Sequence, residues 1–327
     1  MPYSLPAGFL LRRPVLDDIS ALLEMNHACD LADFGRIRTS ESELRSAWEL
    51  PGHDPAQDTW LVIAPDERIA AFAFVGHLAP VSRLFSDLRV HPDYAGLGLY
   101  DYLYELTLER AHVLIPEAEE GVRVSVTVWC PEKRAELRQT AEQAGLKHVR
   151  SNWIMRIDMD QPPPEPVWPE GVELRPYTPE MVRAVYEADD EAFRDHWGHT
   201  RFEFEVWELF MIKRDGFDPS FWFVAFAGEE IAGFSLCSYE QGEAWVGELG
   251  VRRPWRKKGL GLSFLHHSFG EFYRRGVRSV VLNVDSQNLT GATRLYTRAG
   301  MHPVEQTDIY ELELRPGIEL STETLAD

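Results

Sequence analysis

The sequence has few cysteines and no long apolar run. Its 327 residues include three cysteines, Cys29, Cys130 and Cys237, which are too few and too far apart for a disulfide framework or a cysteine metal site. No apolar run approaches the roughly 18 residues of a membrane-spanning helix. The first residues also lack the basic and then apolar layout of a secretory signal. We therefore expect a cytoplasmic protein with no metal and no membrane partner.

Positive charge is also scarce. Lysine and arginine number 33 against 53 aspartate and glutamate residues, so the formal net charge is −20. Such a charge argues against nucleic acid or an anionic membrane as the main partner. Five basic side chains nevertheless lie within seven residues, namely Arg252, Arg253, Arg256, Lys257 and Lys258. A binding site for a compact anion is the functional interpretation of this cluster, and a solvated basic surface is the alternative.

The two halves of the chain repeat one pattern on either side of a proline-rich segment. Residues 159–171 contain five prolines, which favour a stiff, extended spacer. Four segments of the first half match four segments of the second half in the same order. The matching pairs are 6–14 with 169–177, 60–72 with 222–234, 90–100 with 251–261, and 141–146 with 296–301. We predict one domain over residues 1–160, a linker over 161–170 and a second domain over 171–327.

Apolar periodicity predicts a mixture of strands and helices in each half. In the second half, the predicted strands lie near 172–175, 221–227, 231–239, 244–251, 278–284 and 308–314. The predicted helices lie near 179–193, 202–213, 259–273 and 289–299. The expected fold class is therefore α/β (α+β), formed twice.

The segment 248–261 joins a strand, a glycine-containing turn and a helix. The strand is expected to end at Val251, and the turn holds a basic run followed by Gly259 and Gly261. Glycines let the backbone turn tightly and point its N–H groups outward at a helix start, where the helix dipole favours an anion. Neither the GxGxxG pattern nor a P-loop is present. The turn is a candidate site for phosphate or pyrophosphate, and a loop without a ligand is the alternative.

A second candidate segment covers residues 280–301. An apolar strand is followed by Asn288, and the next helix carries Tyr296 shortly before Ala299 and Gly300. A tyrosine at this position is commonly part of a core. Its phenol, with a pKa of about 10, can instead donate a proton to a leaving thiolate. Both interpretations stay open at this point.

Together, the two segments resemble the motifs of the GNAT superfamily of acetyl-CoA-dependent N-acyltransferases. That family has an Arg/Gln-x-x-Gly-x-Gly/Ala motif after its fourth strand, and later Asn, Leu-Tyr and Gly-Phe in that order. The matching residues here are Arg256, Gly259 and Gly261, then Asn288, Leu295, Tyr296, Gly300 and Met301. The resemblance covers nearly the whole chain, once in each half. It implies two tandem GNAT-like domains, each with a mixed, mostly antiparallel sheet flanked by helices.

The resemblance also implies which residues hold acetyl-CoA, the acyl donor. Backbone groups at the strand end are expected to pair with the pantetheine arm, and N–H groups of the turn are expected to hold the pyrophosphate. Tyr296 is expected near the thioester sulfur. The implied cofactor-binding residues are Leu249, Gly250 and Val251, then Arg256, Lys257, Lys258, Gly259, Leu260 and Gly261, and finally Asn288 and Tyr296.

The expected chemistry is direct attack of a neutral primary amine on the acetyl carbonyl. An alkylammonium has a pKa of about 10, so a base must first remove a proton. Tyr296 can protonate the leaving thiolate, and backbone N–H groups can stabilise the oxyanion. Glu243 and Glu248, on the strand that enters the turn, are candidates for the base, and solvent-facing charges are the alternative. Their spacing of five puts them on opposite faces of a regular strand, which a bulge would change.

The first half lacks most of these residues. At the aligned positions, Ala95 replaces Arg256, Gly96 and Leu97 replace the two lysines, Tyr100 replaces Gly261, Lys133 replaces Asn288 and Ala141 replaces Tyr296. Charge, space for a phosphate and the proton donor are lost together. We therefore predict that only the second half is active. The first half is expected to be structural or to supply one wall of the acceptor pocket.

The acceptor site is expected near the loop between the first two helices of the second half, where this family usually builds it. His196 and Trp197 lie in that loop and are candidate contacts of the acceptor, with a cap on the core as the alternative. We predict an N-acetyltransferase that acts on the primary amine of a small molecule, as a monomer or a homodimer. The alternatives are acetylation of a protein or peptide amine, and a non-catalytic acyl-CoA sensor.

Overall fold

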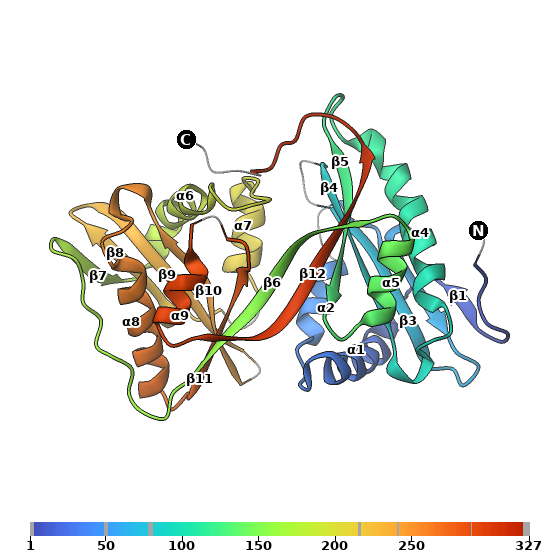
Figure 1. The fold of residues 1–327 in the computed structure, drawn as a ribbon, viewed down its shortest axis with the longest axis horizontal. Coiled ribbons are helices and arrows are strands. Elements are labelled where there is room, and N and C mark those ends of the chain that lie inside the picture. The colour runs from blue at the N-terminus through green and yellow to red at the C-terminus, as the bar shows by residue number, and fades with distance from the viewer. Residues whose placement is uncertain are drawn as a thin grey trace. The chain divides into compact units, whose positions relative to one another are not determined.

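The computed structural model describes residues 3–48, 52–77, 81–214, 217–240, 242–288 and 290–322. Contacts between residues divide the chain into two compact units, whose elements are labelled in Figure 1. Unit 1 holds Met1–Ser151 and Gln306–Leu320, and unit 2 holds Asn152–Glu305 and Ser321–Asp327. Each unit holds a consecutive part of the strand order and its own hydrophobic clusters.

The sheet of unit 1 has the strand order β1-β2-β3-β4-β5-β12. Neighbouring strands are antiparallel except β4 and β5, which run parallel. Its strands are β1 (Leu10–Arg12), β2 (Thr59–Ile63), β3 (Ile69–His77), β4 (Arg83–Val90), β5 (Val124–Pro131) and β12 (His302–Arg315). Its helices are α1 (Ile19–Phe34), α2 (Glu41–Trp48), α3 (Pro55–Asp58), α4 (Leu99–Leu114) and α5 (Ala135–Gln143).

The sheet of unit 2 has the strand order β6-β11-β10-β9-β8-β7. Here β10 and β11 run parallel, and the pairs β6-β11, β10-β9, β9-β8 and β8-β7 are antiparallel. Its strands are β6 (Lys147–Asp158), β7 (Val172–Pro176), β8 (Trp222–Ala227), β9 (Glu230–Glu240), β10 (Glu243–Val251) and β11 (Ser279–Asp285). Its helices are α6 (Val182–Phe193), α7 (Phe204–Met211), α8 (Leu260–Arg274) and α9 (Ala292–Arg298).

Helices cover both faces of the sheet in unit 2. The central strand β9 is buried over nearly its whole length, as expected for a strand that is apolar on both faces. On one face α8 packs through Phe264, Phe269 and Phe272. On the other face α6 and α7 pack through Val185 and Trp207. The sheet is thus held between two apolar layers that fix its position relative to the helices.

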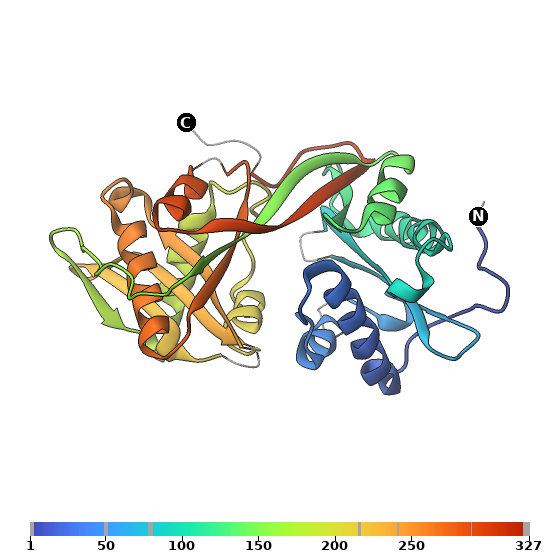
Figure 2. The ribbon, with the colours of Figure 1, turned by 60° about the horizontal axis from the view of Figure 1, so that its bottom comes forward.

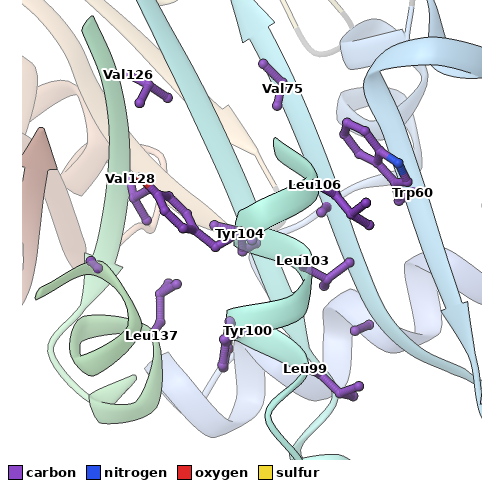
Figure 3. Close-up of a cluster of buried hydrophobic side chains, with 14 of the residues drawn as sticks. Trp60, Val75, Leu99, Tyr100, Leu103, Tyr104, Leu106, Val126, Val128 and Leu137 are labelled. Carbon is purple, nitrogen blue, oxygen red and sulfur yellow. The ribbon is translucent and has the colours of Figure 1, made fainter. Parts of the chain in front are cut away.

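Unit 1 is built in the same way. Figure 3 shows α4 presenting Leu99, Leu103 and Leu106 to one hydrophobic cluster. The opposite face of the sheet is covered by α1, whose Leu22 packs in a cluster with Phe72 of β3. Both units therefore place one helix, α4 or α8, directly after the strand that carries the expected site.

The last strands of the two halves are exchanged between the units. β6 ends the first half of the sequence, but its residues 152–158 pair with β11 in unit 2. β12 ends the second half, but its residues 307–315 pair with β5 in unit 1. The sequence division into 1–160, 161–170 and 171–327 does not anticipate this exchange. Because the two halves repeat one pattern, either strand can pair at either sheet edge. The pattern of residues therefore does not predict which edge each strand joins.

The predicted fold class, an α/β (α+β) chain with mixed, mostly antiparallel sheets flanked by helices, is confirmed. Most elements of the second half begin and end within a few residues of their predicted bounds. The main difference is β12, expected over 308–314 and observed over His302–Arg315. Among the residues described, no helix combines the length and apolar character that crossing a bilayer requires.

Gly250 in β10 is a position where the packing admits no side chain. An added Cβ would overlap the ring of Phe234, which is fully buried. We predict that Gly250→Ala lowers the free energy of unfolding by about 1–3 kcal/mol, because overpacking displaces the ring or the strand. The measurement is urea-induced unfolding followed by circular dichroism.

Gly270→Ala is the matched control for that substitution. Gly270 lies inside α8, and the nearest atom to an added Cβ is Cγ of Pro163 at 3.9 Å, an ordinary contact. Alanine is a better helix former, so this variant should be more stable by up to about 1 kcal/mol. The same loss of stability in both variants would contradict the packing described for Gly250.

Candidate active site

The parallel strands β10 and β11 pair over only a short stretch. Their register contains two pairs, Ala244 with Val280 and Trp245 with Val281. β10 continues to Val251 along β9, and β11 continues to Asp285 along β6. Beyond Trp245 the facing edges of β10 and β11 therefore carry backbone groups outside the sheet ladder. An extended, amide-containing arm such as pantetheine can hydrogen-bond to such an edge.

A β-bulge in β10 coincides with the end of this pairing. The register with β9 shifts between Val246 and Glu248, so Gly247 is the extra residue. Residues directly opposite each other in a ladder share a face, and Glu243, Trp245 and Glu248 lie opposite residues 240, 238 and 236 of β9. Glu243 and Glu248 therefore share one face of the sheet. A regular strand would place these two residues on opposite faces, and the bulge places them on the same face.

Glu248 and Tyr296 lie within electrostatic reach of each other. Burial raises the pKa of Glu248 well above its usual range, and the charge of Asp189 adds to this rise. Burial also raises the pKa of the Tyr296 phenol, and the charge of Glu248 contributes. Tyr296 is 8% exposed and belongs to the hydrophobic cluster under α8. The structure thus brings a carboxylate with increased basicity and a protonated phenol into one region of unit 2.

The turn after β10 has the backbone expected of an anion site. A short 3-10 helix at Arg253–Trp255 is followed by Lys257 with φ 62° and Gly259 with φ 90°. Gly259 is the N-cap residue of α8, and no side chain caps the first N–H groups of that helix. Left-handed backbone at a lysine is uncommon and is often found at functional sites. The free N–H groups and the helix dipole suit a phosphate.

The arginines of the basic cluster are used for structure. Arg256 donates from Nη1 to Asp195 Oδ2 at 2.6 Å, from Nη2 to the Ala192 carbonyl at 3.0 Å and from Nε to the Val251 carbonyl at 3.0 Å. Arg253 donates to Asp195 Oδ1 at 2.6 Å. These bonds tie the turn to the end of α6, so the guanidinium groups are not free for an anion as the sequence alone suggested.

Two lysines supply the remaining positive charge of the turn. Lys257 and Lys258 are exposed, and no ion pair within the described ranges involves them. Arg252 resembles the other arginines, because its Nε donates to Glu191 Oε2 at 2.6 Å. The turn therefore combines N–H groups with two exposed ammonium groups, while its arginines fix its position.

Asn288 is hydrogen-bonded within the turn that leads into α9, whose N-cap residue is Gly291. Its Oδ1 accepts hydrogen bonds from the Thr290 N–H at 2.9 Å, the Thr290 hydroxyl at 2.6 Å and the Ala292 N–H at 3.2 Å. These contacts explain an asparagine at this position through helix geometry. Asn288 thereby fixes the start of the helix that carries Tyr296, and its role in cofactor binding remains a prediction from the resemblance.

The loop that carries His196 and Trp197 is held from two sides. Asp195 connects it to the turn through Arg253 and Arg256. On the other side, the Gly198 N–H donates to the Thr322 carbonyl at 2.7 Å and the Thr322 N–H donates to the His199 carbonyl. Nothing in the sequence pattern indicated Asp195 or Thr322 as partners of this loop. The loop and the turn therefore form one connected structure.

His196 is a neutral group in this loop. Its ring packs against Phe193 with 4.5 Å between centroids. The pKa of His196 is lowered to about 4, mainly by burial, and the neighbouring His199 and Arg256 act in the same direction. Trp197 is half-buried beside it. Asp195, the residue before them, is bonded to the turn, and the contact of His196 and Trp197 with an acceptor remains a prediction.

In unit 1, the edge of β4 that corresponds to the open edge of β10 is hydrogen-bonded to a side chain. β4 and β5 share four pairs, up to Ser86 with Val128, and β4 has no register shift against β3. Beyond these pairs Arg134 donates from Nη1 to the Leu88 carbonyl at 3.2 Å and from Nε to Asp33 at 2.6 Å. Leu88 aligns with Leu249, so a guanidinium lies where unit 2 has a free edge.

The turn of unit 1 has the same backbone conformation as the turn of unit 2, but one of its N–H groups is bonded to a carboxylate of unit 1. Gly96 and Gly98 have φ 76° and 72°, matching Lys257 and Gly259. The Gly96 N–H donates to Glu136 Oε2 at 3.0 Å. A carboxylate oxygen therefore stands where a phosphate oxygen would be bound.

The large and small residues at two pairs of aligned helix positions are also interchanged. Unit 1 has Tyr100 and Ala141 where unit 2 has Gly261 and Tyr296. Tyr100 lies in the hydrophobic cluster of Figure 3 and is 6% exposed. An added Cβ at Gly261 would lie 2.9 Å from Leu295 Cδ2. Tyr100 thus fills the core, where the sequence comparison expected it to crowd the turn.

These features are those of a GNAT acetyltransferase, and comparison with known proteins agrees. A model of the acetyltransferase (GNAT) family matches residues 182–301. Mycothiol acetyltransferase of Thermobispora bispora is 29% identical over 295 residues, covering 86% of this chain and 92% of the relative. That of Streptomyces scabiei is 30% identical over 262 residues, covering 77% and 79%.

A solved structure extends the similarity to the whole fold. The GCN5-related N-acetyltransferase from Sphaerobacter thermophilus is 39% identical, with a TM-score of 0.82, and covers 98% of this chain and 100% of that one. The chain therefore belongs to the GNAT family, as its motifs predicted. It is an acetyl-CoA-dependent N-acetyltransferase.

Asp195 connects the acceptor loop to the turn, so its removal should disturb the turn. We predict that Asp195→Asn weakens acetyl-CoA binding about tenfold, the effect of about 1.4 kcal/mol, because Arg253 and Arg256 lose a charged partner. Isothermal titration calorimetry measures this affinity. Asp158→Asn, which breaks an exposed pair with Arg156 in the same unit, should have no effect. Unchanged affinity of Asp195→Asn would show that the turn does not depend on the bonds between Asp195 and the two arginines.

Proposed function

We propose that unit 2 transfers the acetyl group of acetyl-CoA to the primary amine of a small molecule by direct attack. The observation that carries this proposal is the combination of Glu248, Tyr296 and the open strand edge after the bulge at Gly247. The family match over residues 182–301 lies entirely in the second half. The two relatives named for acetylation of mycothiol support a small-molecule acceptor.

The proposed cofactor site follows the strand edge into the turn. Backbone groups of Leu249–Val251 would pair with the pantetheine arm, since this part of β10 lies beyond its pairing with β11. N–H groups from Lys257 to Gly261 would hold the pyrophosphate, with the two lysine side chains adding charge. Bound acetyl-CoA supplies a thioester whose carbonyl carbon is open to attack.

Glu248 is the proposed base. Its raised pKa makes it a better acceptor for a proton of the acceptor ammonium. Glu243 is less well placed, because it precedes the paired residues Ala244 and Trp245 and lies opposite Glu240 near the hairpin end. The amine freed by Glu248 can then form the C–N bond while backbone N–H groups of β10 stabilise the oxyanion.

Tyr296 is the proposed acid. As the C–S bond breaks, its phenol donates a proton to the departing thiolate and regains one from the amine nitrogen. Its raised pKa keeps the phenol protonated at neutral pH. The products are the amide and the free thiol of CoA, and the proton taken by Glu248 returns to water.

Unit 1 is proposed to be a degenerate domain of the same type that binds no acyl-CoA. Arg134 occupies its strand edge, and Glu136 occupies its turn. The proposed domains follow the sequence repeat, 1–160 and 171–327, with the last strands exchanged. Unit 1 then acts as a structural partner of the active domain.

Acetyl-CoA should bind once per chain. Calorimetry of the full chain is expected to give a stoichiometry of one, because Arg134 and Glu136 occupy the strand edge and the turn of unit 1. Lys258→Glu should weaken this binding, since it places a negative charge at the pyrophosphate. Leu97→Glu, at the aligned and exposed position of unit 1, should leave it unchanged. Two equal sites would rule out a degenerate first domain.

Tyr296→Phe should lower turnover while acetyl-CoA affinity stays within about twofold. Loss of a general acid typically costs about 100-fold or more in rate. The assay is thiol release from acetyl-CoA with a panel of primary amines. Tyr273→Phe, on α8 beside Arg278, is the control and should keep its rate. Equal turnover in the Tyr296 variant would remove this residue from the acid role, and binding without any thiol release would indicate an acyl-CoA sensor.

A further inference from the structure

Asp189, on α6, is a carboxylate that the mechanism above does not use. Its Oδ2 accepts a hydrogen bond from Nε1 of Trp207 at 2.7 Å. Its Oδ1 is buried and has no hydrogen-bond partner within the described residues. A buried carboxylate oxygen without a partner is unfavourable and is unusual in a folded protein. An oxygen in this state suggests that a ligand completes it.

The bulge in β10 brings Glu248 to the face of the sheet that α6 covers. Glu248 lies opposite Leu236 of β9. Leu236 packs in one cluster with Val185 of α6 and Trp207 of α7. Asp189 lies on the same helix as Val185, one turn later, and its charge acts on Glu248. Two carboxyl groups from different elements therefore share one region of unit 2.

No cation of the described chain neutralises this pair. Within the described residues, neither Asp189 nor Glu248 takes part in an ion pair, whereas the adjacent Asp190 is bonded to Arg194 at 2.7 Å and to Arg201 at 3.2 Å. The other titratable groups acting on the pair are Asp190 and Tyr296, which add no positive charge. The pair thus lacks a positive partner.

Trp207 fixes the orientation of Asp189. Its indole is 5% exposed and packs edge-on against Tyr186 and Trp222. Because the indole N–H holds Oδ2, the other oxygen is presented in one direction. Trp207 is therefore both part of the core and the support of a polar group.

We infer that Asp189 and Glu248 together bind the ammonium form of the acceptor, with Oδ1 of Asp189 accepting one N–H and Glu248 taking the proton that is lost. This inference rests on the proposed function of unit 2. An alkylammonium offers several N–H donors, so both carboxyl groups can be satisfied at once. Asp189 would then select acceptors that are cationic when they bind, over neutral amines of the same shape.

The step balances without any further reactant. The ammonium gives one proton to Glu248, and its nitrogen forms the C–N bond as the C–S bond breaks. The second proton of the nitrogen reaches the sulfur through Tyr296. Asp189 keeps its charge throughout, so it is a specificity-determining residue and not the base.

The first test compares ethylamine with 2,2,2-trifluoroethylamine, which has nearly the same shape but is largely neutral at pH 7.5. Asp189→Asn retains an oxygen for Trp207 and should fold normally, which thermal unfolding checks. It should raise the KM for ethylamine at least tenfold and change the KM for the fluorinated amine less than twofold. Glu187→Gln, exposed on the same helix, should change neither. An equal change for both amines, or none, would overturn the inference.

The second test does not depend on turnover. Carboxyl resonances of protein labelled with [δ-¹³C]glutamate report the titration of Glu248, assigned by its loss in Glu248→Gln. The midpoint should fall in Asp189→Asn, because a neighbouring negative charge is gone, and ethylammonium chloride should lower it in the parent but not in that variant. Potassium chloride at equal concentration is the control. No shift in either experiment would overturn the inference even if acetyl transfer is observed, whereas a shift without turnover would count against the proposed function alone.

Discussion

One extra residue in β10, Gly247, separates two kinds of backbone in unit 2. Before it, β10 is paired on both sides; after it, the strand is paired only with β9 and has a free edge. The same bulge turns Glu248 to the face of Glu243 and Trp245. A sheet needs its strands paired to be stable, so an edge of this kind persists only because β9 and β6 hold the two strands apart. The proposed thioester site lies on that edge.

Ion pairs connect this edge to its surroundings. Asp195 accepts from Arg253 and Arg256, and the loop that contains it is bonded to Thr322. The three arginines that the sequence concentrates around the turn are therefore paired with carboxylates and fix the position of the turn. Unit 1 shows the opposite balance, because its own Arg134 and Glu136 take up the edge and the turn. The two halves share the same backbone conformation at the turn. In unit 1 its hydrogen-bonding groups are bonded to side chains of the chain itself, whereas in unit 2 we propose that they bind the cofactor.

The sequence predicted the elements of the second half, the turn and its helix because these depend on local periodicity and on glycine. It could not predict contacts between distant residues. The pairing of β6 with β11 and of β12 with β5 follows from edges that either strand can join. The bulge at Gly247 could be considered but not predicted, because a single extra residue changes the alternation of polar and apolar residues too little to be recognised. Asp195 and Asp189 lie on an ordinary acidic helix and the loop after it, with no local signal for their partners.

The most direct test of this account is a crystal structure of the full chain with acetyl-CoA. We expect one molecule per chain, with its pyrophosphate on the N–H groups of Lys257–Gly261, its arm along Leu249–Val251 and its thioester between Glu248 and Tyr296. Acetyl-CoA along β4 in unit 1, or bound in unit 2 with its thioester remote from both residues, would contradict it.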